Sequence, residues 1–180
     1  MREALRKIED GEYWVYGPTV GELDRVLELV QKYSDYADTC VERLADGTEV
    51  PAEFADAHAE VSSDLRYYNY LEKGLLWSFA LWRLQGVFEA MLVSTFLPTK
   101  PAKPLVGLRS KLDAVGAAGY LLKPELERDL LAWGRLRNIL SHMPPEQYRP
   151  IAIDRQDVEE YLALLKQVCG EWEAQRAHGL

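Results

Sequence analysis

The sequence predicts an all-α protein: a helical bundle of about five main helices with an N-terminal extension. Every long apolar run repeats at helical spacing, and no segment alternates apolar and polar residues as a half-buried strand does. Prolines mark the connections between the runs, because proline interrupts helical hydrogen bonding. A length of 180 residues, with 48% apolar and 28% charged residues, indicates a single globular domain over residues 1–180.

The first half of the chain predicts two helices after an irregular start. Residues 1–10 predict a short helix, and residues 11–18 predict a connector with at most a short strand at 13–16. Thr19 and Glu22 have the spacing of a capping box, and apolar residues then recur at helical spacing until Gly47. Another helix is expected to open at Pro51 and to run into the apolar segment that follows.

That apolar segment, residues 74–97, is long enough to raise the question of a membrane span. However, Arg83, Gln85 and Glu89 lie near its middle, where charged groups in lipid are costly and rare. We therefore expect a central helix buried by protein on nearly all sides, and no membrane partner.

A loop and a short helix come next. Residues 98–104, PTKPAKP, hold three prolines and predict a stiff exposed loop. Residues 106–118 predict a short helix that ends at Gly119.

The last two helices are expected to open at Pro124 and at Asp154, with a loop over residues 144–153 between them. The first has an inward apolar stripe of Leu126, Leu130, Trp133, Leu136 and Leu140. The stripe of the second is Val158, Tyr161, Leu162, Leu165, Val168 and Trp172.

Cysteine usage and the N-terminus favour a cytoplasmic protein. Cys40 and Cys169 lack the paired spacing of a disulfide framework or a zinc site, which fits a reducing compartment. The first residues have no apolar signal-peptide core and are too acidic for a transit peptide. No metal site and no cofactor are expected.

Residues with catalytic chemistry cluster near the end of the helix that opens at Pro124. Arg137 is a permanent planar cation suited to phosphate, and His142 can move protons near neutral pH. Five positions separate them, so on an ideal helix they point about 140° apart. We expect the last turn to loosen before Pro144, and Asn138 to hydrogen-bond the ring of His142, four residues away.

The run LLAWGRLRNILSHMPP resembles the signature of the HEPN superfamily (higher eukaryotes and prokaryotes nucleotide-binding). That signature is an arginine, commonly followed by Asn, Asp or His, and then a histidine after a short spacer. Arg137, Asn138 and His142 match it one for one. The resemblance covers residues 74–172, and residues 1–73 are then a family-specific N-terminal helical part.

The resemblance implies a function. Many HEPN domains are metal-independent endoribonucleases of the toxin or defence type, and they dimerise with two motifs meeting across a twofold axis. The implied partners are RNA, a second copy of the chain, and an antitoxin or a nucleotidyltransferase-like protein. Other members are inactive helical modules for dimerisation, protein binding or nucleotide binding, and this alternative stays open.

The chemistry explains the need for a dimer. Attack of the 2′-hydroxyl requires a base, an acid for the leaving oxygen and a cation on the phosphorane. Each chain offers only His142 in a plausible position, so a second protomer would supply the second histidine.

Charge gives a mixed prediction. A net charge of −8 argues against binding long nucleic acid with the whole surface. Residues 1–90 carry 9 Lys+Arg against 18 Asp+Glu, whereas residues 99–150 carry 9 against 5. A local basic cleft around Arg137 is therefore expected, with substrate contacts from Lys103, Arg109, Lys111 and Arg135. The alternative is a solvated surface on which Arg137 pairs with Glu127 or Asp129.

Glu89 is the remaining candidate. It follows Phe88 on the apolar helix and should be buried, so it needs a partner. It is expected either to orient Arg137 or His142, or to pair structurally with Arg83 or a tyrosine.

Overall fold

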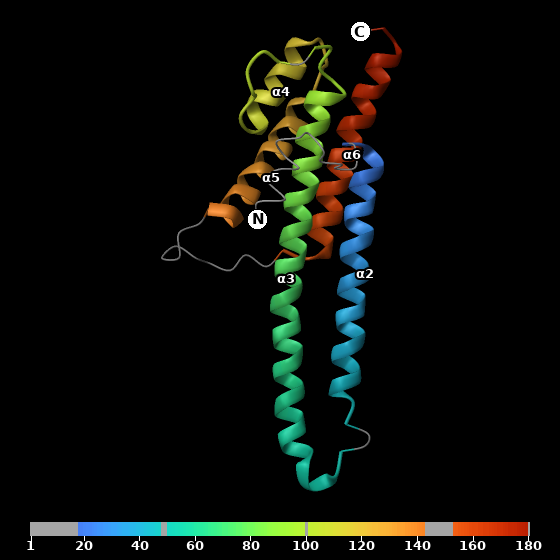
Figure 1. Cartoon of the computed structure of the whole chain (residues 1–180), viewed down its shortest axis with the longest axis vertical. Coiled ribbons are helices and arrows are strands. Elements are labelled where there is room, and N and C mark those ends of the chain that lie inside the picture. The colour runs from blue at the N-terminus through green and yellow to red at the C-terminus, as the bar shows by residue number, and fades with distance from the viewer. Residues whose placement is uncertain (1–17, 48–49, 100, 143–152, 180) are drawn as a thin grey trace, which may run out of the picture.

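All the regular structure in the described part of the chain is helical. The computed structural model describes residues 18–47, 50–99, 101–142 and 153–179 (Figure 1). Its elements are α2 (Val20–Ala45), the 3-10 helix η1 (Ala52–Phe54), α3 (Ala55–Ser94), α4 (Gly107–Ala117), α5 (Pro124–His142) and α6 (Arg155–Ala177). The prediction of an all-α bundle with about five main helices is confirmed. The helix predicted over 1–10 and the strand predicted over 13–16 lie outside the described residues.

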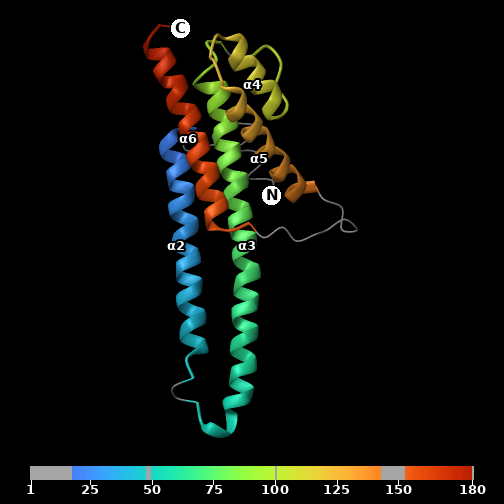
Figure 2. The same cartoon turned by 180° about the vertical axis from the view of Figure 1, so that it is seen from behind.

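The two longest helices, α2 and α3, form an antiparallel hairpin that runs the length of the molecule (Figure 1). Helix α6 packs against both of them over one half of the hairpin, and α4 and α5 pack against the same half of α3 (Figures 1 and 2). The other half of the hairpin extends beyond these helices. The molecule is therefore a bundle at one end and a two-helix projection at the other.

Local sequence signals set most of the helix ends. The Thr19 side chain accepts a hydrogen bond from the Glu22 amide at 3.3 Å. Asp154 and Asp157 form a reciprocal capping box at the start of α6. Gly119 follows α4 with φ of 103°, a conformation that side chains disfavour, so the helix ends there as predicted.

The core is built between α3 and α6. Trp172 is almost completely buried, stacks on Phe88 with ring centroids 6.4 Å apart and meets Phe96 edge-on at 5.1 Å. Its Nε1 donates to the carbonyl oxygen of Leu121 at 3.1 Å. All six stripe residues predicted for α6 are buried, which confirms that stripe.

The segment 74–97 departs from its prediction on one side. Trp77, Leu81, Leu84 and Phe88 are buried. Leu75 and Phe79 are 62% exposed, so the expectation of burial on nearly all sides is wrong. Helix α6 covers one flank of α3 and leaves the opposite flank open. Within the described residues, no helix combines the length and apolarity needed to cross a membrane.

Both cysteines are free thiols, so neither contributes a cross-link to the fold. Cys169 is fully buried in α6. Burial, with a smaller contribution from the Glu173 charge, raises the pKa of its thiol to about 12. Cys169 therefore acts as an unreactive apolar core residue at neutral pH.

Truncation of the central tryptophan tests this core. We expect Trp172→Ala to lower the free energy of unfolding by about 3–5 kcal/mol, because it empties the space between Phe88 and Phe96. Urea denaturation followed by circular dichroism measures the change. The control is Leu121→Ala, since that side chain is 76% exposed and only its backbone contacts Trp172. Equal losses in the two variants would place the core elsewhere.

Candidate functional site

Arg137 lies near the end of α5 and has no carboxylate partner among the described residues. It is half-buried, and its guanidinium donates from Nη1 to Oδ1 of Asn138 at 3.0 Å. Its Nε is buried and has no hydrogen-bond partner within the described part of the chain. One turn later the Ser141 hydroxyl donates to the backbone oxygen of Arg137 at 2.8 Å. These hydrogen bonds hold Arg137 in place, and some of its guanidinium N–H groups have no acceptor among the described residues.

The last turn of α5 does not loosen as expected. The helix continues to His142, so the Cα–Cβ directions of Arg137 and His142 remain about 140° apart. The His142 side chain and residues 143–152 lie outside the described residues, and so does the expected bond between Asn138 and the ring. The Oδ1 atom of Asn138 accepts a hydrogen bond from Arg137 Nη1.

A buried polar cluster lies close to Arg137. The Gln85 amide donates to Glu89 at 2.7 Å, and the Lys111 ammonium forms an ion pair with the other Glu89 oxygen. The side chains of Lys111 and Glu89 are 17% and 16% exposed. The alternative in which Glu89 pairs with Arg83 or a tyrosine is wrong. Arg83 pairs with Glu22 at 3.0 Å, and Glu89 bonds to the Gln85 amide and the Lys111 ammonium. Lys111 is also not available for the predicted contact to substrate, because its ammonium pairs with Glu89.

Tyr161 joins α6 to this cluster. Its ring is fully buried and stacks on Trp133 with centroids 5.1 Å apart, and its hydroxyl has no partner among the described residues. Burial raises the pKa of Tyr161 far above its usual value, the Glu89 charge raises it further, and the Arg137 charge lowers it. Both charges therefore lie within electrostatic range of one neutral phenol.

Three helices thus contribute polar atoms that have no partner within the described residues. These atoms are Gln85 Oε1 from α3, Arg137 Nε from α5 and Tyr161 Oη from α6. Buried polar atoms are normally paired, so unpaired groups on neighbouring helices mark a polar site within an apolar core. Neither Gln85 nor Tyr161 was predicted as a site residue: Gln85 served only as evidence against a membrane span, and Tyr161 occupies an inward position of an apolar stripe and was interpreted as a core residue.

The expected basic rim around Arg137 does not form. Arg109 forms an ion pair with Glu127. Arg135 is two positions from Arg137 and so lies about 200° around the helix from it. It faces an open depression between α4 and α5 that Arg109, Glu127 and Arg128 also line. The prediction that these cations line one cleft around Arg137 is therefore wrong.

Two of the expected substrate cations stay free. Lys103, on the loop before α4, and Arg135 are exposed and have no ion-pair partner among the described residues.

The alternative in which Arg137 is an ordinary surface ion pair is also wrong. Its expected partners are occupied: Glu127 pairs with Arg109, and Asp129 with Arg128 at 3.0 Å. Among the described residues, no group of three or more His, Cys, Asp or Glu side chains is placed to hold a metal ion.

Within the described residues, the fold and the site define an all-α bundle in which a half-buried arginine without an acidic partner lies beside a buried polar cluster. Comparison of the chain with family models, with curated proteins and with solved structures gives no match. The likeness to HEPN domains therefore rests on Arg137, Asn138 and His142 and on their helical context.

Substitution of Tyr161 tests whether its hydroxyl is unpaired. We expect Tyr161→Phe to keep or raise the free energy of unfolding, by up to about 1 kcal/mol, because a buried hydroxyl without a partner is unfavourable. Tyr161→Leu should lower it by about 1 kcal/mol or more, since the stacking on Trp133 is lost. Urea denaturation of both variants gives the values. A clear loss of stability in Tyr161→Phe would show that the hydroxyl is hydrogen-bonded in the cluster.

Proposed function

We propose that the protein is a metal-independent endoribonuclease of the toxin or defence type, which cleaves RNA by 2′-hydroxyl attack in a cleft shared by two protomers. Arg137 stabilises the charge on the phosphate, and His142 transfers protons. Asn138 positions the arginine through the hydrogen bond at 3.0 Å. An antitoxin or a nucleotidyltransferase-like protein is the further partner that the HEPN resemblance implies.

The observation that supports this proposal is that Arg137 has no acidic partner among the described residues. Arg66, Arg83, Arg109, Arg128 and Arg155 all pair with acidic side chains. Arg137 is half-buried and pairs with none among the described residues. A partly desolvated cation without a counter-charge is costly, so a protein keeps one where an anion will bind. A phosphate, which accepts from a guanidinium in a bidentate manner, suits the free donors.

The geometry of α5 favours a second protomer in the site. Because α5 stays helical to His142, positions 137 and 142 of one chain are about 140° apart around the helix axis. A twofold axis near the end of α5 would bring the histidine of one chain toward the arginine of the other. It would also supply the two proton-transfer groups that 2′-hydroxyl attack requires. The free cations Lys103 and Arg135 are the proposed contacts to the rest of the RNA backbone.

A second candidate function has its own support. Large apolar side chains are exposed along α2 and α3, and such surfaces mark protein interfaces. A non-enzymatic helical module for dimerisation or partner binding would use them, and the acidic first half of the chain also suits protein contacts.

Incubation of the purified protein with mixed RNA in EDTA tests the ribonuclease. We expect cleavage by the wild type and none by His142→Ala. Arg137→Ala should lower the rate by about 100-fold or more, because it removes a positioned charge-stabilising donor. Arg137→Lys should be nearly as slow, since lysine lacks the bidentate fork. Asn138→Ala should be milder, because the arginine itself remains.

The control is Arg155→Ala, which removes an exposed, ion-paired arginine from α6 and should keep full activity. Cleavage that needs a metal ion, or that survives His142→Ala, would show the mechanism to be wrong. A variant Arg137→Ala that unfolds but keeps its activity per folded molecule would make the arginine a structural residue.

A further inference from the structure

The projecting half of the hairpin has no apolar core of its own. Among the described residues from Gln31 to Leu75, none belongs to the buried apolar cluster or packs against it. This segment, here called the arm, comprises the end of α2, the turn with η1 and the first half of α3 (Figure 1). Helices in water depend on an apolar face buried against a neighbour. The arm therefore lacks the packing that usually stabilises a helix pair.

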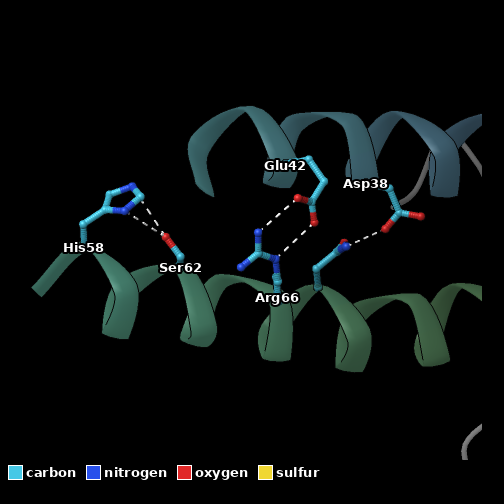
Figure 3. A network of polar contacts seen from close by, with 6 residues as sticks. Asp38, Glu42, His58, Ser62 and Arg66 are labelled. Atoms are coloured by element: carbon cyan, nitrogen blue, oxygen red, sulfur yellow. Dashed lines mark hydrogen bonds and ion pairs between the residues drawn. The ribbon is translucent and has the colours of Figure 1, made fainter. Parts of the chain in front are cut away.

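The seam between the two helices of the arm is small and polar (Figure 3). Ser34 and Ser62 are its buried members. Glu42 and Arg66 form two hydrogen bonds of 3.1 Å, and Asp38 accepts from Asn69 at 2.7 Å. The pair Glu42–Arg66 is more than half exposed, and exposed ion pairs contribute about 1 kcal/mol at most. These contacts set the register of the helices but do not replace a core.

Eight large apolar side chains of the hairpin point away from this seam, to one side, whereas Tyr67, Tyr70 and Leu71 are exposed on other sides of α3. On α2, Asp24 and Gln31 bond to α6 and mark the flank that faces it. Leu29, Tyr33 and Tyr36 lie on the opposite flank, since two positions correspond to about 200° on a helix. On α3, Phe88 faces α6 through Trp172, and Leu75 and Phe79 lie on the opposite flank.

We call this surface the aromatic face; the exposed residue Glu72 lies within it on α3, four positions after Tyr68 and three before Leu75. Its members are Leu29, Tyr33, Tyr36 and Leu44 from α2, and Val61, Tyr68, Leu75 and Phe79 from α3. The ion pair of Arg66 with Glu42 gives the register, which brings Tyr33 level with Leu75 and Leu29 level with Phe79. Val61, Tyr68 and Leu75 are spaced by seven residues, the repeat of helices that pack side by side in bundles.

The aromatic face has the size of a specific interface. Each of its eight side chains is more than half exposed. If each contributes roughly 100 Å², the face offers on the order of 800 Å², which is what one partner buries in a standard protein–protein interface. Tyrosine is also enriched in such interfaces, because its ring is apolar and its hydroxyl tolerates water.

The charges beside the aromatic face show what fits it. Over residues 31–75 the chain carries 10 Asp+Glu against 4 Lys+Arg, which at first favours a basic partner. On α2, however, Asp38 and Glu42 lie on the flank away from the face and pair with α3. The α2 residues that border the face are Lys32 and Arg43, eleven positions and so about three turns apart.

The border on α3 has the opposite sign. Asp64 lies between Val61 and Tyr68 on the helix surface, with Glu60 one turn before it. Lys32, Arg43, Glu60 and Asp64 are exposed, and none has an ion-pair partner among the described residues. One edge of the face is therefore basic and the other acidic.

We propose that two copies of this chain associate through their aromatic faces, with the arms pointing the same way and α2 of each copy over α3 of the other. A twofold axis along the arms places Arg43 of one copy beside Asp64 of its partner, at the same height. The opposite arrangement would stack α2 on α2 and bring like charges together. The chosen arrangement makes all neighbouring helices antiparallel, as in a four-helix bundle. It also gives the arm the apolar core that it lacks.

This interface is separate from the proposed catalytic cleft. Helices α4 and α5 contact α3 through Lys111 and Gly134, which meet Glu89 and Gln85 on another side of that helix. Association through the arm therefore neither requires nor provides the shared site of Arg137 and His142, and it is tested without reference to RNA cleavage.

The experiment is the molar mass of the full chain by light scattering and sedimentation at micromolar concentrations. Tyr68→Glu should halve the mass, from dimer to monomer or, if the catalytic cleft also assembles, from tetramer to dimer. The dissociation constant of the arm interface should rise roughly 30-fold or more. The matched control is Tyr70→Glu. Tyr70 is 57% exposed, like Tyr68 at 61%, but points to the other flank of α3. Circular dichroism confirms that both variants are folded.

Charge reversal tests the arrangement. Arg43→Glu and Asp64→Arg should each weaken association, and the double variant should restore it, because the two charges meet only between copies. A monomeric wild type overturns the proposal, including one that binds a basic helical peptide. Equal masses for Tyr68→Glu and Tyr70→Glu overturn the aromatic face as the interface. A double variant weaker than either single variant overturns the arrangement of α2 over α3.

Discussion

The packing of α3 against α6 is the interaction on which the rest of the structure depends. Phe88 and Trp172 stack at the centre of this contact, and the apolar core is built around them. Because α6 covers one flank of α3, helices α4 and α5 pack on a remaining side and carry Arg137 to the edge of the core. Because α6 is shorter than the hairpin, no other described helix covers the arm (Figure 2).

The two ends of α3 therefore lie in opposite environments. In the bundle, polar groups are buried among apolar side chains, and Glu89 is neutralised by Lys111 while atoms of Gln85, Arg137 and Tyr161 have no partner among the described residues. In the arm, apolar groups are exposed and polar groups form the seam. Each end reverses the usual arrangement of apolar side chains inside and polar side chains outside. Each reversal suggests a ligand: an anion for the half-buried Arg137, and a second apolar surface for the exposed aromatic face.

Local sequence determined the helices and most of their ends. Thr19, Pro124 and Asp154 act within one turn of their own position, so caps and starts could be predicted without knowledge of the fold. The all-α class and the inward stripe of α6 followed from helical periodicity for the same reason. The presence of Arg137, Asn138 and His142 on one helix was likewise determined by sequence spacing.

Only the tertiary structure decided which partner each side chain meets. Arg109 pairs with Glu127 and Lys111 with Glu89 because α4 packs against both α3 and α5, and no local pattern encodes that position. Tyr161 has the periodicity of a core residue, and only its packing places its hydroxyl near two charges. The apolar stripe of α3 predicted burial on nearly all sides, but burial depends on where α6 ends. Periodicity specifies which residues share a face of a helix, whereas long-range packing decides whether anything covers that face.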